Sequence, residues 1–129
     1  YGTAEDAWRI ITPSTAFLAE MVGTAMLAFL VATVTHHRNT ARPPSAMGAV
    51  IIGIGVAAII SVIAPLTQAG INPARDFGPR LVSFFLGWGE IAIPGPRGGF
   101  FTIYILAPIL GALIGGGLYR VIANRIPKD

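Results

Sequence analysis

The segment Gly70-Ile71-Asn72-Pro73-Ala74-Arg75-Asp76-Phe77-Gly78-Pro79 predicts a helix start within a strongly apolar chain. Asn is a preferred N-cap residue because its side-chain oxygen accepts a hydrogen bond from a free backbone N–H of the first turn, and proline is best tolerated at the next position. The NH2 group of Asn72 then remains available as a donor. Arg75 lies one turn into this helix, and the carboxylate of Asp76 is favoured near the positive end of the helix dipole. Such a helix start suits a site that meets a polar solute.

Composition indicates a membrane protein. Hydrophobic residues make up 53% of the 129 residues and charged residues only 12%, which leaves too little polar surface for a soluble domain of this length. The sequence has no cysteine, which excludes disulfides and thiolate metal sites. It begins at Tyr1 without a methionine or a signal-peptide pattern, so we expect a fragment or a processed piece of a longer protein.

Three apolar segments are long enough to cross a bilayer. A hydrocarbon core of about 30 Å requires roughly 20 helical residues, and the segments 15–35, 46–64 and 100–122 approach or exceed that length. The segment 72–87 is also apolar but too short to span, and Gly87-Trp88-Gly89 closes it. We therefore predict three transmembrane helices and one re-entrant half-helix.

The basic residues predict the orientation. One membrane face carries Arg38, Arg42, Arg120, Arg125 and Lys128, and the other carries Arg9 and Arg97, besides Arg75 and Arg80 of the half-helix. Because short cytoplasmic loops are enriched in Arg and Lys, the first face and the C-terminus are expected to be cytoplasmic, with the half-helix entering from outside. The basic residues flank the spans, so the pI near 10 fits lipid headgroups and not a nucleic-acid partner.

Small residues recur at helical spacing on every span. They are Thr24, Ala28 and Ala32 on the first, Ala49, Gly53, Ala57 and Ser61 on the second, and Ala107, Gly111 and Gly115 on the third. Such stripes allow helix backbones to approach closely in lipid. We interpret them as generic helix packing.

The residues from Asn72 to Pro79 resemble the second signature of the major intrinsic proteins, the aquaporins and glycerol facilitators. The resemblance covers essentially the whole chain, since the order of spans and half-helix corresponds to the C-terminal half of that fold. It implies an all-α membrane protein with an aquaporin-like bundle, in which residues 1–129 form one inverted repeat of three transmembrane helices plus a re-entrant half-helix. From the family we also expect a homotetramer in the plasma (inner) membrane.

The resemblance further implies a passive channel for water and small uncharged solutes, glycerol-type polyols among them, that excludes ions and protons. Asn72, Pro73 and Ala74 would form the pore motif, where helix-end donors hold passing oxygens and the positive dipole end opposes cations. The family implies no catalysis, no cofactor and no metal.

Other residues receive supporting roles from the same resemblance. Arg75 would belong to the outer selectivity filter, together with Ala69 and Ile60. Glu20 is an intramembrane carboxylate, which makes it a candidate functional residue. In the family reading it accepts backbone hydrogen bonds that hold the re-entrant loop, and Asp76 supports the half-helix. An Arg75–Asp76 pair is disfavoured because adjacent helical residues do not face each other.

The motif and filter residues indicate different solutes. Asp76 and Arg80 resemble the glycerol-facilitator branch. Ile60 and Ala69 look more like the vacuolar plant members, which are associated with water, urea or ammonia. Two further residues depart from the family pattern, Gln68 before the motif and Tyr104 in the last span. Tyr104 and Trp88 are most simply interfacial aromatic anchors.

Only one signature is present, and one copy makes half a pore. We favour a fragment over two oppositely oriented chains, because the charge bias argues against dual topology. The alternative function is a non-conducting membrane assembly or regulatory subunit with the same fold. A membrane enzyme using Glu20 with His36 is disfavoured because the two lie 16 residues, about 24 Å, apart along one helix. His36 and His37 suggest a pH gate, although such a pair is more often only solvated.

Overall fold

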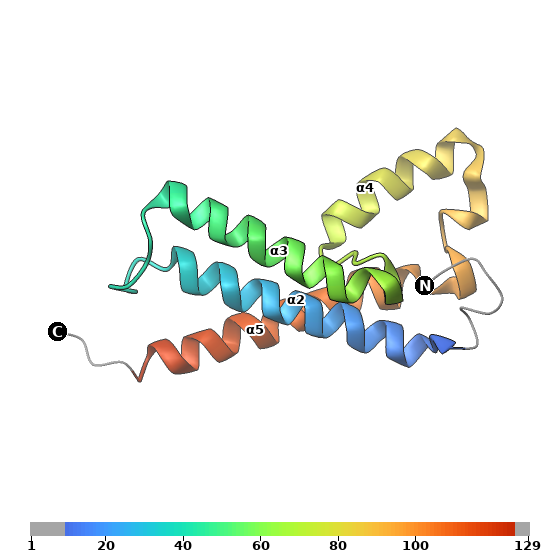
Figure 1. Cartoon of the computed structure of the whole chain (residues 1–129). Coiled ribbons are helices and arrows are strands. Elements are labelled where there is room, and N and C mark those ends of the chain that lie inside the picture. Colours follow the sequence, from blue (N-terminus) through green and yellow to red (C-terminus); the bar gives the residue numbers. More distant parts are fainter. Residues whose placement is uncertain (1–9, 126–129) are drawn as a thin grey trace.

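The computed structural model describes residues 10–125, so the predictions that involve Arg9 and Lys128 lie outside the described residues. The described part contains helices and connecting turns and no strand. Its regular helices are α2 (Pro13–Thr35), α3 (Ser45–Thr67), α4 (Pro73–Ser83) and α5 (Ala107–Ala123). The π-helical segment η4 (Phe100–Leu106) runs directly into α5. In Figure 1, α2, α3 and α5 run alongside one another, while α4 slants away from them.

Three helices are long and apolar enough to cross a membrane within the described residues, Pro13–Thr35, Ser45–Thr67 and Phe100–Ala123. Each is one to four residues longer than the corresponding predicted segment. The first helix starts early because the hydroxyl of Thr12 caps it, accepting the backbone N–H of Thr15 at 3.1 Å, with proline in the first turn. The protein is thus an integral membrane protein of the all-α class.

The half-helix predicted over 72–87 is α4 together with the π-helical turn η1 (Phe84–Trp88). The 11 residues of α4 span about 17 Å at about 1.5 Å per residue, roughly half of the hydrocarbon core. Gly87 ends the helical path with a φ of 100°, a conformation in which a side chain is rarely tolerated.

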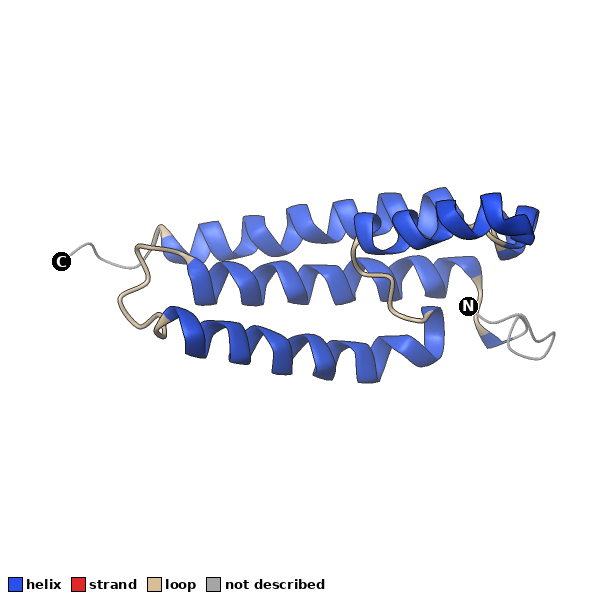
Figure 2. Ribbon diagram, turned by 90° about the horizontal axis from the view of Figure 1, so that it is seen from above, coloured by secondary structure: helices blue, strands red, loops and turns tan. Residues whose placement is uncertain are grey.

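The bundle is organised around α2, which packs against both α3 and α5. Figure 2 shows the helices from a second direction as parallel rows. On α5, a Cβ at Gly111 or Gly115 would collide with the backbone carbonyl oxygens of Met21 and Ala25, respectively, so the predicted close approach on the third span is confirmed.

The stripe on the second span behaves differently. Ala49, Gly53, Ala57 and Ser61 are all exposed, and no neighbour within the described residues lies near a Cβ built on Gly53. The packing interpretation was therefore wrong for this stripe as far as the described contacts go. A pattern of small residues shows which face permits close approach, but only tertiary structure shows what approaches it.

Two apolar clusters form the core, and both surround the loop that precedes α4. One contains Ile11, Ala16, Ile103 and Tyr104; the other contains Ala19, Ile59, Ile63, Ala69 and Ile71. The described core therefore lies at the end of the bundle where the half-helix begins.

Candidate functional site

The loop that joins α3 to α4 has a strained backbone. Gln68, Ala69 and Ile71 have φ values of 68°, 52° and 38°, in the left-handed region that favours glycine. Gln68 is the C-cap of α3, where glycine is common because it lacks a Cβ. A loop of this kind persists only when surrounding groups hold it.

Glu20 of α2 is the main partner of this loop. Its side chain is completely buried. Oε1 accepts the backbone N–H of Gly70 at 2.8 Å and the hydroxyl of Thr67, and Oε2 accepts the backbone N–H of Ile71. Both carboxylate oxygens are thereby occupied, and α2 is tied to the residues immediately before α4.

Two threonines reinforce the same loop, and sequence reasoning gave neither of them this role. The hydroxyl of Thr24 donates to the backbone carbonyl oxygen of Glu20 at 2.7 Å and also lies within hydrogen-bond distance, 3.2 Å, of the carbonyl oxygen of Ile71. Thr67 donates to the carboxylate of Glu20 and accepts the backbone N–H of Ala69 at 3.2 Å. Sequence analysis could not assign these contacts with the loop, because Ile71 and Glu20 each lie 47 residues from the threonine they contact across the bundle.

Tyr104 is a third missed residue, and its expected role as an interfacial anchor was wrong. The side chain is only 6% exposed. Its hydroxyl donates to the carbonyl oxygen of Thr67 at 2.8 Å, and its ring lies so close to Gly70 that a Cβ there would be 2.7 Å from the ring. Any larger residue at position 70 would therefore displace Tyr104 or the loop. Trp88, the other expected anchor, is exposed.

Asn72 caps α4 as its sequence context predicts. Its Oδ1 accepts the backbone N–H groups of Ala74 and Arg75, at 3.0 and 3.3 Å, and Pro73 occupies the first helical position. The side chain of Asn72 is exposed, and its Nδ2 has no hydrogen-bond partner within residues 10–125. The cap therefore leaves one amide donor free at the start of the half-helix.

Arg75 folds back over the loop. One guanidinium nitrogen donates to the carbonyl oxygens of Ala69 and Gly70, at 2.6 and 3.2 Å. No carboxylate within the described part of the chain pairs with Arg75, and Asp76 instead pairs with Arg80. The other N–H groups of the guanidinium have no acceptor within residues 10–125.

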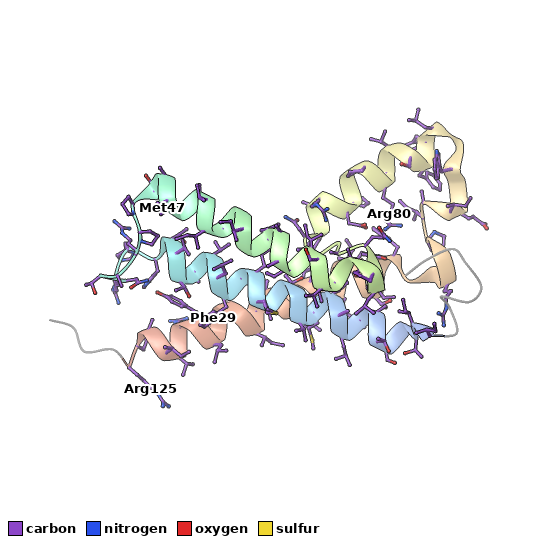
Figure 3. All side chains as sticks on the ribbon, viewed as in Figure 1. Phe29, Met47, Arg80 and Arg125 are labelled. Carbon is purple, nitrogen blue, oxygen red and sulfur yellow. The ribbon has the colours of Figure 1, made fainter. Side chains whose placement is uncertain are left out.

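Asp76 and Arg80 form a bidentate pair one turn apart on α4. Arg80 Nε and Nη2 each lie 2.8 Å from a carboxylate oxygen of Asp76, and both side chains are largely buried. The guanidinium also donates to the carbonyl oxygen of Ala92 at 3.0 Å and lies over the rings of Phe100 and Tyr104, at 5.4 and 4.8 Å. Figure 3 shows Arg80 between α4 and the segment leading into α5. This pair connects the half-helix to the loop and helix that follow it.

The remaining predicted filter residues lie deeper than Arg75. The methyl group of Ala69 is fully buried, so only its carbonyl oxygen contributes to the site. Ile60 is half-buried and packs against the cluster that includes Ala69 and Ile71. The structure thus gathers all eight predicted residues around one loop and helix start: Glu20, Ile60, Ala69, Asn72, Pro73, Ala74, Arg75 and Asp76.

His36 and His37 are not part of this site. They follow the end of α2 that is distant from Glu20, and the His36 ring contacts His37 and Tyr119 with centroid distances of 4.9 and 5.4 Å. Among the residues described, no cluster of three or more His, Cys, Asp or Glu side chains is arranged to hold a metal ion.

Comparison with known proteins identifies the family of this chain. The family model of the major intrinsic proteins matches residues 3–119. The chain therefore belongs to the major intrinsic protein family, whose fold is an aquaporin-like helical bundle.

Within this family, the chain is similar to several curated proteins. The chain is 45% identical over 115 residues to a glycerol uptake facilitator protein of Pseudomonas aeruginosa, an alignment that covers 88% of this chain and 41% of that protein. It is 40% identical over 114 residues to a glycerol uptake facilitator protein of Haemophilus influenzae, covering 87% and 43%. A propanediol uptake facilitator of Citrobacter freundii is 39% identical over 111 residues, covering 85% and 41%. The chain spans about two fifths of the length of these relatives.

Proposed function

We propose that this chain forms one half of a passive membrane pore for glycerol and other small uncharged solutes. The observation that carries the proposal is the start of α4, where, among residues 10–125, Asn72 keeps a free amide donor and Arg75 pairs with no carboxylate. A hydroxyl oxygen can accept from both groups, whereas a cation meets the arginine charge and the positive helix end. In this proposal the site binds and releases a passing solute and carries out no chemistry.

The support around α4 fits this role. Glu20 holds the loop through both carboxylate oxygens, so the carbonyl groups that orient Arg75 have fixed positions. In this proposal Asn72, Pro73 and Ala74 form the pore motif. Ala69 contributes its carbonyl oxygen to the filter, and Ile60 forms part of the wall behind it.

The choice of solute follows from the relatives, which are named as glycerol and propanediol uptake facilitators. These names do not favour the non-conducting alternative. Asp76 and Arg80 agree with that branch, and their pairing compensates the two charges within α4. We further propose a bacterial inner-membrane location, a homotetramer, and a cytoplasmic face formed by the ends of α2 and α5 where Arg38 and Arg120 lie.

Stopped-flow light scattering of proteoliposomes tests the proposal. The protein is expressed from its complete reading frame, and vesicles are challenged first with sucrose and then with glycerol. We expect shrinkage in sucrose and rapid re-swelling in glycerol, both faster than in empty vesicles. Glycerol entry no faster than in empty vesicles would refute the proposal, and fast water flux without glycerol entry would restrict the pore to water.

Arg75→Ala is the variant that tests the filter. It removes the fixed charge and the wide guanidinium, so we expect faster glycerol flux and measurable leakage of protons or small cations, read with a pH-sensitive dye inside the vesicles. Arg97→Ala, in the loop before η4, is the matched control and should leave both readings unchanged. Unaltered flux and unaltered ion exclusion in the Arg75 variant would remove this residue from the filter.

A further inference from the structure

A groove with polar lining lies at the end of the bundle opposite the site around α4. It is a groove of about 1240 Å³ between the ends of α2 and α5 and the loop that follows α2. Its lining includes Phe29, Arg38, Asn39, Tyr119, Arg120 and Asn124. In Figure 3, Phe29 lies on α2 beside α5, and Arg125 marks the end of α5. The groove belongs to no part of the site around α4.

The groove is positively charged. Arg38 and Arg120 line it, and both side chains are exposed. Within residues 10–125 the acidic residues are Glu20, Asp76 and Glu90, and none of them lines the groove. The described ion pairs include neither arginine. Two guanidinium groups thus line the groove, and no described carboxylate lines it to neutralise their charge.

The loop that forms one wall of the groove has a defined conformation. Asn39 donates its side-chain amide to the carbonyl oxygen of Thr33 at 2.7 Å and accepts the backbone N–H of Ala41 at 3.1 Å. The backbone of Asn39 also bonds to His36 and Arg42. These bonds fix the conformation of the loop segment that carries Arg38. This wall of the groove therefore has a defined shape.

His36 provides an independent sign of a missing partner. It lines the groove, and its Nδ1 is buried without a hydrogen-bond partner in the described part of the chain. A buried polar atom without a partner is costly, and most such atoms in proteins are paired with protein, water or a ligand. Rotation of the imidazole would present this nitrogen to an acceptor in the groove.

The position of the groove indicates what kind of acceptor this is. It lies where two candidate membrane spans end, at Thr35 and Ala123, which is the level of the lipid headgroups. Polar and basic groups at its mouth meet apolar groups such as Phe29, Ala32 and Ile122. A phospholipid has the same division between a charged phosphate and an apolar chain, and basic pockets between spans are known sites for anionic lipids.

We propose that this groove binds an anionic phospholipid, whose phosphate is held by Arg38 and Arg120 with Asn39 and His36 as further polar contacts. The proposal is independent of the pore, because it concerns the other end of the bundle and its test does not measure transport. Helix C-termini also attract cations through the helix dipole, so the arginines alone do not require a ligand. The groove and the unpaired His36 nitrogen are the additional observations that point to one.

Native mass spectrometry of the complete protein in detergent provides the test, with phosphatidylglycerol and phosphatidylcholine of identical acyl chains as probes. The variant Arg38→Gln/Arg120→Gln removes the two groove arginines. The matched control is Arg42→Gln/Arg125→Gln, which removes the same charge at the same end from residues that do not line the groove. The melting temperature of each variant in detergent establishes that it is folded.

We expect the groove variant to bind phosphatidylglycerol about thirtyfold more weakly, since each arginine near an anionic lipid contributes about fivefold. The control variant should lose much less, and phosphatidylcholine binding should not change in either. Equal losses in the two variants would overturn the proposal in favour of a general basic surface. Displacement of phosphatidylglycerol by excess inorganic phosphate would also overturn it, because the ligand would then be a soluble anion.

Discussion

The charged groups at the two ends of the bundle differ in their partners. At the end where α4 begins, Glu20 accepts three hydrogen bonds. Asp76 and Arg80 form a bidentate pair there, and the Arg80 guanidinium lies over two aromatic rings. At the other end, Arg38 and Arg120 line a groove without a described carboxylate, and His36 Nδ1 has no partner in the described residues.

This difference follows from what surrounds each end. In our proposal the half-helix starts within the membrane, so the polar groups of the loop before it need partners from the chain itself, apart from those that face the solute. The ends of α2 and α5 lie at headgroup level, where lipid phosphates and water are available. Internal pairing thus marks the loop that must be rigid, whereas the charged groups without a described carboxylate, Arg75 among them, are the ones that meet solute or lipid.

The largest expected effect comes from Glu20→Gln. An amide cannot accept all three hydrogen bonds and brings an NH2 group against backbone donors, so we expect a loss of about 3 kcal/mol in the free energy of unfolding. Glycerol flux should fall with it, because the loop that orients Arg75 is released. Thermal unfolding in detergent measures the first effect. Glu90→Gln, at an exposed position, is the control and should leave stability unchanged. Equal effects of the two variants would show that the hydrogen-bonded carboxylate of Glu20 contributes no more to stability than an exposed carboxylate.

A smaller loss is expected from Asp76→Asn. The pair with Arg80 is largely buried, so its disruption should cost about 2 kcal/mol, between the values typical of surface and buried pairs. The double variant Asp76→Asn/Arg80→Gln should recover part of this loss, because no uncompensated charge remains. A double-mutant cycle on the melting curves measures the coupling. Strictly additive losses would show that the two residues do not act as a pair.

Tyr104→Phe separates the hydroxyl from the ring. The ring remains over Arg80 while the hydrogen bond to the Thr67 carbonyl is lost, which should cost about 1 kcal/mol. Because that carbonyl precedes the loop that orients Arg75, the ratio of glycerol to water flux should also change. Tyr119→Phe, at the open end, is the matched control and should alter neither quantity. If the flux ratio is the same in both variants, Tyr104 has only a structural role.

The smallest expected effect is a gain from Gln68→Gly. The left-handed conformation at this position costs a residue with a Cβ about 1 kcal/mol, and the greater unfolded-state freedom of glycine offsets part of the relief, leaving a gain of about 0.5 kcal/mol. Ala57→Gly, at an exposed position inside α3, should instead destabilise by about 1 kcal/mol. A rise in melting temperature for Gln68→Gly and a fall for Ala57→Gly would support the strain at Gln68. A fall for both variants would contradict it.

Much of the fold follows from the sequence because its causes are local. A run of apolar residues long enough to span, an Asn-Pro helix start and a closing Gly-Trp-Gly need no knowledge of distant contacts. For the same reason the cap by Asn72 and the separation of Arg75 from Asp76 follow from helix geometry alone. The α3 stripe and Tyr104 were misread because exposure and partners depend on how the helices pack.

By itself, the sequence determined that the chain lies in a membrane, which segments span it, and where the half-helix begins. The tertiary structure decided which groups hold that helix start in place: Glu20, Thr24, Thr67 and Tyr104 come from three separate helices and meet one loop. It also decided that Ala69 offers a carbonyl group and not a side chain, and that two distant arginines share a groove. Helix starts and spans depend on neighbours in the chain, whereas hydrogen-bond partners across a bundle depend on the packing that brings distant residues together.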